Sequence, residues 1–225
     1  MPANRLQLKL GHVLLQPGSL ETQIGAALDL ALEFMRRSPP DALLDTYLGN
    51  AGSQVLSTIK RSVMCVDHAG LITPARTDAR ELNAIADRHG FTENHKTFPS
   101  VIVASELAAL NGDSPVPTQI FRGSTRKADA TQPSFGIEMF VPDTFPDTVE
   151  RWIKQGVGTH AAFRVHNRAD VDLIRTELIA AGFHTPSFMG GKSMANTNDG
   201  TLTVYFDLTL PDGDFRLEFF HRAAD

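Results

Sequence analysis

The sequence predicts an α+β fold in which paired βαβββ modules form a curled sheet behind a helical N-terminal extension. Two short apolar strands, "VDHAGLITP" (66–74) and "GTHAAFRVH" (158–166), each carry one histidine near the start, His68 and His160. Each histidine precedes a Gly-Phe pair by 22 residues, counted from 68 to 90 and from 160 to 182. Because self-similarity at a fixed spacing indicates duplicated units, we expect two modules with the same order of elements.

Residues 1–62 are expected to form the helical extension. Apolar residues recur at helical spacing over 19–37, where Ser19 can cap the helix start and two arginines favour its end. A second helix is predicted with Ser38 as its N-cap, Pro39 at its first position and Gly49 as its end, and a third is predicted over 53–60. No residue pattern in this extension suggests chemistry.

The first module is assigned to 63–145. Its pattern predicts a strand at 62–73, followed by a helix at 78–90. Three further strands are predicted within 97–107, at 114–123 and at 134–142.

Residues 146–225 are assigned to a linking helix and the second module. The linking helix is predicted within 143–156. The strand at 158–165 is followed by a predicted helix over 168–182 and by strands at 201–210 and 214–222. The turn signal "PDGD" joins these last two strands. The two modules together therefore account for about 63–222.

Composition narrows the classes of partner and compartment. The net charge is −5 and no dense run of Lys or Arg appears, which argues against nucleic acid or an anionic membrane surface as a partner. No apolar run approaches the roughly 20 residues that a membrane helix needs, and the start does not read as a signal peptide. The single cysteine, Cys65, rules out an intrachain disulfide and fits a reducing compartment. We expect a cytoplasmic protein.

The paired residues that carry chemistry are two histidines and two glutamates. Each module ends in a strand with one glutamate among apolar neighbours, Glu138 in the first and Glu218 in the second. A buried carboxylate needs a partner or becomes protonated, so these glutamates either face water on a one-sided sheet or meet a cation. Equivalent positions in two modules favour the cation. Imidazole and carboxylate together suit Zn, Fe, Mn, Ni or Co.

Two βαβββ units with His on the first strand and Glu on the last resemble the vicinal oxygen chelate superfamily over about 63–222. That superfamily includes glyoxalase I, extradiol dioxygenases and methylmalonyl-CoA epimerase. The resemblance implies a curled sheet that cups one metal, whose open positions bind two oxygens of the substrate. The glyoxalase-like pattern would use His68, Glu138, His160 and Glu218.

The segments "DHAGLIT", "GFTENHKTFP", "THAAFRV" and "RLEFF" also resemble the 2-oxoadipate dioxygenase/decarboxylase (hydroxyglutarate synthase) family. This resemblance implies an Fe(II) site with His68, His160 and Glu218 as ligands, and leaves Glu138 outside the ligand set. The arginine that would hold the substrate carboxylate in that family is replaced here by Ile72. Arg164, four residues after His160, lies on the same strand face and is a candidate to replace it.

The leading functional hypothesis is an Fe(II) dioxygenase that acts on a 2-oxo acid or a similar substrate with vicinal oxygens. The metal ligands would be His68, His160 and Glu218, with Glu138 and Arg164 as catalytic candidates. The alternatives are a glyoxalase- or epimerase-type lyase or isomerase that uses Zn, Ni, Co or Mn, and a metal-free binding protein for small molecules. The expected partner is a small, anionic molecule, and homodimerisation is left open.

Overall fold

The computed structural model describes residues 6–37, 39–74, 78–127, 134–196, 200–210 and 213–222. Four α-helices precede the sheet, whose first half contains β1–β4 and whose second half contains β5–β8. The elements in chain order are α1 (Leu6–Leu14), α2 (Leu20–Arg37), α3 (Pro40–Leu48), η2 (Gly49–Ala51), α4 (Ser53–Ser62), β1 (Val63–Ile72), α5 (Ala79–Arg88), β2 (Glu93–Pro99), α6 (Val101–Leu110), β3 (Thr118–Ser124), β4 (Gly136–Pro142), α7 (Pro146–Lys154), β5 (His160–Val165), α8 (Arg168–Ala180), η3 (Ser187–Met189), β6 (Met194–Ala195), β7 (Leu202–Leu210) and β8 (Gly213–His221).

The strands form one eight-stranded sheet in the order β2-β3-β4-β1-β5-β8-β7-β6. Within the first half β1 pairs in parallel with β4, and within the second half β5 pairs in parallel with β8. The antiparallel pair β1–β5 joins the halves. This topology confirms the α+β fold of paired βαβββ units. Strand β6, only two residues long, supplies the third strand after α8, which the sequence pattern did not reveal.

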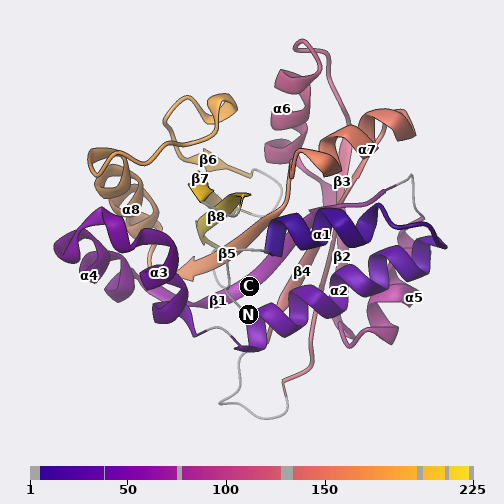
Figure 1. Ribbon diagram of the computed structural model, residues 1–225, viewed down its shortest axis with the longest axis horizontal. Helices are drawn as coiled ribbons and strands as arrows, with labels where there is room; N and C mark the ends of the chain where they lie inside the picture. The colour runs from indigo at the N-terminus through magenta and orange to yellow at the C-terminus, as the bar shows by residue number, and fades with distance from the viewer. Residues whose placement is uncertain are drawn as a thin grey trace.

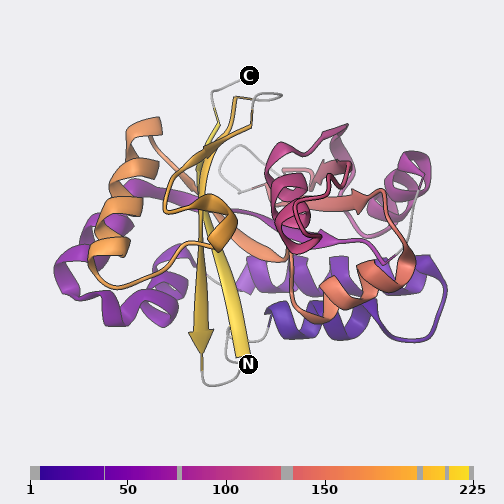
Figure 2. The same cartoon turned by 90° about the horizontal axis from the view of Figure 1, so that it is seen from above.

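Helices α1, α2, α3 and α8 pack against the central strands of the sheet. Helices α2 and α3 contact β1, α1 contacts β8, and α8 contacts β5, β7 and β8. Tyr47 of α3 stacks on Phe215 of β8 with ring centroids 4.2 Å apart. Figures 1 and 2 show α4 and α8 at one end of the molecule and α5 at the other. The N-terminal helices therefore share one hydrophobic core with the sheet.

The predicted helices over 19–37, 39–49 and 53–60 correspond to α2, α3 and α4, whereas α1 was not predicted. Ser38, the predicted cap of the second helix, lies outside the described residues, as does part of the turn at 211–214. Among the described residues, no helix is long and apolar enough to cross a membrane.

One segment differs from its prediction. The strand predicted within 97–107 ends at Pro99, and α6 follows directly. Ser100 caps α6, because its hydroxyl oxygen accepts a hydrogen bond from the backbone N–H of Val103. The β-branched run at 101–103 resembles a strand in sequence, but the serine cap and the helix-favouring Ala, Glu and Leu residues of 104–110 favour a helix.

Candidate metal centre

His68 is positioned by an irregularity in β1. Val66 pairs with Phe163 and His68 pairs with Ala162, so Asp67 is an extra residue opposite β5. A bulge of this kind changes the direction of the side chains beside it. The Oδ1 atom of Asp67 lies 3.0 Å from Nδ1 of the neighbouring His68.

His160 opens β5 and lies opposite Gly70 of β1. Its Nδ1 atom is 3.0 Å from the carbonyl oxygen of Gly158. A Cβ atom added at Gly70 would lie 2.1 Å from Cε1 of His160, so the imidazole occupies the space above this glycine. The position of the His160 ring therefore depends on the absence of a side chain at Gly70.

The pairing of the central strands brings both glutamates to the histidines. Gly70 pairs with His160 on one side and with Glu138 on the other. In the second half, Ala162 pairs with His68 on one side and with Glu218 on the other. Residues that pair across strands present their side chains on the same face. Each small residue thus separates one histidine from one glutamate, and the duplicated halves place four ligand-type side chains on one face.

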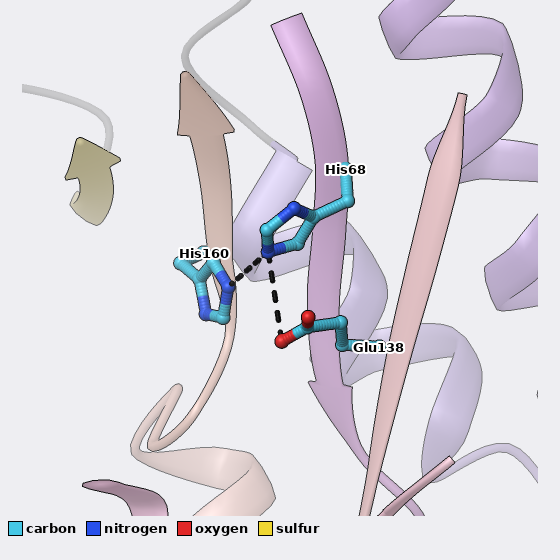
Figure 3. A group of neighbouring side chains, drawn as sticks. All are labelled: His68, Glu138 and His160. Carbon is cyan, nitrogen blue, oxygen red and sulfur yellow. Dashed lines mark hydrogen bonds and ion pairs between the residues drawn. The ribbon is translucent and has the colours of Figure 1, made fainter. Parts of the chain in front are cut away.

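The four side chains converge at their tips. The Nε2 atoms of His68 and His160 are 3.4 Å apart, and Oε2 of Glu218 lies 3.3 Å from the first and 2.8 Å from the second. Oε2 of Glu138 lies 3.6 Å from Nε2 of His68. All four residues are buried. Figure 3 shows His68, Glu138 and His160 pointing toward one another, and their ligand atoms lie within 4.8 Å of each other.

The donor atoms fit a divalent cation. The carbonyl of Gly158 only accepts hydrogen bonds, as does the carboxylate of Asp67, so each histidine donates from Nδ1 and turns the Nε2 lone pair to the centre. This arrangement, with the second imidazole nitrogen bound to a carboxylate or carbonyl, is typical of metal-binding histidines. Oε2 of Glu218 is buried and makes no well-aligned hydrogen bond within the described residues, despite its proximity to His160. Two lone pairs and one unpartnered anionic oxygen point to the same place.

The pKa of His68 indicates that the two carboxylates of the ion-free site also require a positive charge. Burial lowers the pKa of His68, but the charge of Glu138, the hydrogen bond of Asp67 and the charge of Glu218 outweigh it and raise that pKa to about 10. In the absence of an ion, a proton on His68 therefore supplies the positive charge that the two carboxylates require.

The two glutamates have different partners. Oε1 of Glu138 accepts hydrogen bonds from Nε and Nη2 of Arg122, the former at 2.8 Å, and Nη2 of Arg222 is 3.6 Å away. Burial raises the pKa of Glu138, but the charges of Arg122 and His68 outweigh it and lower that pKa to about 2. Glu218 instead accepts a hydrogen bond at Oε1 from the Thr203 hydroxyl at 2.6 Å.

Neither Arg122 nor Arg222 was predicted as a site residue. In the structure Arg122 belongs to β3 and is the direct cross-strand partner of Glu138. Only the register of the β3–β4 pair reveals this contact, because the two residues are 16 positions apart.

Arg164, the other catalytic candidate, pairs with Cys65 and Phe220 and is half-buried. Four residues of strand separate it from His160 by about 13 Å along β5. Within the described part of the chain, no hydrogen bond or ion pair joins Arg164 to the four clustered residues. Its role in substrate binding stays a prediction.

A small cavity lies beside the two glutamates. The space open to the centres of water molecules in it is about 20 Å³, and one water needs roughly 10–15 Å³ on this measure. Residues from both halves and from α6 line it: Ser100, Ile102, Val103, Ile120, Arg122, Glu138, Phe140, Asn196, Thr201, Tyr205, Glu218 and Arg222.

Comparison with known proteins gives no family by sequence. No protein-family model matches the chain, and no curated protein matches it significantly. Among solved structures, a variant of Streptomyces coelicolor methylmalonyl-CoA epimerase in complex with 2-nitronate-propionyl-CoA matches with a TM-score of 0.46 and 17% identity, over 72% of this chain and 100% of that chain.

Two further solved structures are similar at the same level. Methylmalonyl-CoA epimerase from Mycobacterium tuberculosis matches with a TM-score of 0.42 and 14% identity, over 72% of this chain and 91% of that chain. A mutant of 4-hydroxymandelate synthase from Streptomyces coelicolor matches with a TM-score of 0.44 and 14% identity, over 73% of this chain and 50% of that chain.

Proposed function

We propose that this chain is a metal-dependent enzyme of the vicinal oxygen chelate type. The observation that carries the proposal is the convergence of two imidazole Nε2 atoms and the unpartnered Oε2 of Glu218 within 2.8–3.4 Å of one another in a buried site. A buried anionic oxygen without a hydrogen-bond donor is unfavourable unless a cation binds it.

Three residues, His68, His160 and Glu218, would hold the ion. Glu138 is the weaker candidate because Arg122 already binds one of its oxygens and neutralises its charge. Two histidines and one carboxylate leave open positions and are the ligand set typical of non-haem Fe(II), so Fe(II) is favoured over Zn, Ni, Co or Mn. When bound, such an ion would polarise two neighbouring oxygens of the substrate and, as Fe(II), would make O₂ chemistry accessible.

The low pKa of Glu138 and its hydrogen bonds to Arg122 favour an Fe(II) dioxygenase over an isomerase. An isomerase of the glyoxalase or epimerase type needs a general base that moves a proton at neutral pH. A carboxylate whose pKa is about 2 and which is held by Arg122 is a weak base. Glu218 would be occupied as a ligand. The isomerase alternative therefore lacks an evident base among the four residues.

The two guanidinium groups in the cavity wall favour a small anionic substrate, such as a 2-oxo acid. Arg122 and Arg222 both line the cavity, and they balance the charges of Glu138 and Glu218 there. A divalent ion would then leave a net positive site. An anionic substrate would compensate this charge.

Elemental analysis and turnover test the proposal together. The protein is purified without chelators, its metal content is measured, and the metal-free protein is then loaded with Fe(II) without air. We expect close to one ion per chain and O₂ consumption with at least one member of a panel of 2-oxo acids. Solvent deuterium incorporation into the substrate without O₂ uptake would support the isomerase. Absence of any bound ion would favour a metal-free binding protein.

A further inference from the structure

The cavity beside the candidate metal centre is too small for any substrate of the kind proposed. Its water-accessible space of about 20 Å³ holds one water, or at most two. Pockets that bind organic ligands are about an order of magnitude larger. For a substrate to approach the metal centre through this cavity, part of the cavity wall has to move.

Helix α6 is the wall element that the paired-module fold does not require. It is inserted between β2 and β3, and the second half has no helix between β6 and β7 within the described residues. The interval from histidine to glutamate is correspondingly longer in the first half, at 70 residues (68 to 138) against 58 (160 to 218). The ten-residue α6 accounts for most of this difference.

Helix α6 covers the site from the first half and reaches the second. Ile102 and Val103, both buried, line the cavity opposite the glutamates. The helix contacts β3 on one side and η3 on the other. Figure 1 shows it standing between β3 and the β6–β7 end of the sheet. Helix α6 thus bridges the two halves above the site.

One buried ion pair ties α6 to the second half. Oε1 of Glu106 lies 2.6 Å from Nη1 of Arg216 on β8, and both residues are more than nine-tenths buried. Arg216 also binds Asp207 of β7, with Nε 2.6 Å from Oδ1. The other oxygen of Glu106 is buried without a hydrogen-bond partner among the described residues.

The ion pair between Glu106 and Arg216 can break without leaving an uncompensated buried charge. When Glu106 leaves, Arg216 keeps the carboxylate of Asp207, so no isolated buried cation remains. Glu106 in turn gains water for an oxygen that has no donor in the closed arrangement. The usual cost of breaking a buried ion pair comes from an uncompensated charge, and here that charge is compensated.

The chain after α6 offers a hinge. Gly112 and Asp113 have φ values of 63° and 61°, in the left-handed region that a non-glycine residue adopts at a cost. Residues that absorb a change in backbone angles commonly lie at the end of a moving element.

We propose that α6 is a movable lid over the metal centre, held closed by the ion pair between Glu106 and Arg216. The nature of the ligand that the lid admits rests on the proposed function. The motion of the lid is a separate property and is measured separately.

The matched variants are Glu106→Gln and Asp207→Asn. Both remove one negative charge from Arg216, but only Glu106 belongs to α6. We expect Glu106→Gln to speed the release of bound Co(II) to excess EDTA by about tenfold or more, which corresponds to the loss of one charge-assisted hydrogen bond. Release from Asp207→Asn should stay within about twofold of the wild type.

Hydrogen–deuterium exchange of the full chain gives a readout that needs no metal. In the wild type, amides of α6 should exchange faster than those of β1 and β8, and Glu106→Gln should accelerate α6 alone. If α6 in the wild type is protected as strongly as β8, the lid is excluded, even should Glu106→Gln fail to fold. Equal acceleration by both variants would also overturn it. Absence of bound Co(II) in the wild type would refute the proposed function and leave the exchange comparison to decide the lid.

Discussion

The imidazole of His160 lies directly over Gly70, where an added Cβ atom would approach to 2.1 Å from Cε1, 2.6 Å from Nδ1 and 2.7 Å from Nε2. Contacts under 3.0 Å are not tolerated, so any side chain at this position must displace the ring. The equivalent position in the second half, Ala162, carries a methyl group between His68 and Glu218. The duplicated site is thus asymmetric at its centre, and His160 depends on a glycine.

The first prediction is that Gly70→Ala lowers metal content. Its methyl group would push the His160 ring away from His68 and from Glu218, which separates the three ligand atoms. We expect the purified variant to bind less than about a tenth of the wild-type metal, because one imidazole ligand is lost from the site. Metal analysis after dialysis checks this expectation, with circular dichroism as a check on folding.

The control for this variant is Gly49→Ala. Gly49 has a φ of −57°, and an added Cβ there meets no atom within 4 Å. We expect full metal content and unchanged stability for Gly49→Ala. Full metal content in Gly70→Ala would show that His160 is not a ligand or that its ring can shift without loss of the site.

A second prediction concerns the hydrogen bond that orients Glu218. The Thr203 hydroxyl donates to Oε1 of Glu218 and leaves Oε2 to face the histidines. Thr203→Val keeps the shape and removes the donor, so we expect metal affinity to fall by about 10–100-fold. Competition with a fluorescent chelator measures it. Thr118→Val serves as the control, because Thr118 is also buried in a strand but bonds to the carbonyl of Val116.

The grouping of the four side chains could be predicted from sequence because the chain is duplicated. The equal spacings after His68 and His160 indicate the same order of elements in both halves. In the structure each glutamate pairs with the residue two positions beyond the histidine of its own half. Arg122 could not be found in the same way. Its contact with Glu138 depends on the β3–β4 register, and the long segment between the two residues hides that register.

The strand predicted within 97–107 is largely replaced by helix α6, and this difference has a physical cause. Val101, Ile102 and Val103 are β-branched and favour strands when only propensity is considered. Helix α6 forms nonetheless because Ser100 caps it and because Ile102, Val103 and Leu107 bury one apolar face against the sheet. Tertiary packing of this kind has no signal in a single sequence.

A third prediction concerns the single cysteine. Burial, together with the nearby charge of Asp67, raises the pKa of Cys65 to about 11. At pH 8 the thiolate fraction of the folded protein should be about a hundredfold lower than for a free thiol of pKa near 9, so alkylation by iodoacetamide should be slow. The rate, followed by mass spectrometry, should keep rising up to about pH 11. A plateau near pH 9 in the folded state would contradict the prediction.

The fourth prediction separates the two glutamates. Glu138→Gln and Glu218→Gln both keep the size of the side chain and remove one charge. Glu218→Gln should lose most of the metal, because Oε2 of Glu218 is the anionic oxygen nearest to both Nε2 atoms. Glu138→Gln should keep close to one ion per chain, since Arg122 rather than an ion is the main partner of Glu138.

The stability of the protein should respond in the opposite order, with the larger loss in Glu138→Gln. Removing the charge of Glu138 leaves the partly buried guanidinium group of Arg122 without its carboxylate, so we expect a loss of unfolding free energy of about 1–3 kcal/mol and reduced turnover despite bound metal. Metal analysis and urea unfolding of the two variants decide between the ligand sets. Equal and severe loss of metal from both variants would favour a four-ligand site and, with it, the isomerase alternative. Retention of metal by Glu218→Gln would remove Glu218 from the site altogether.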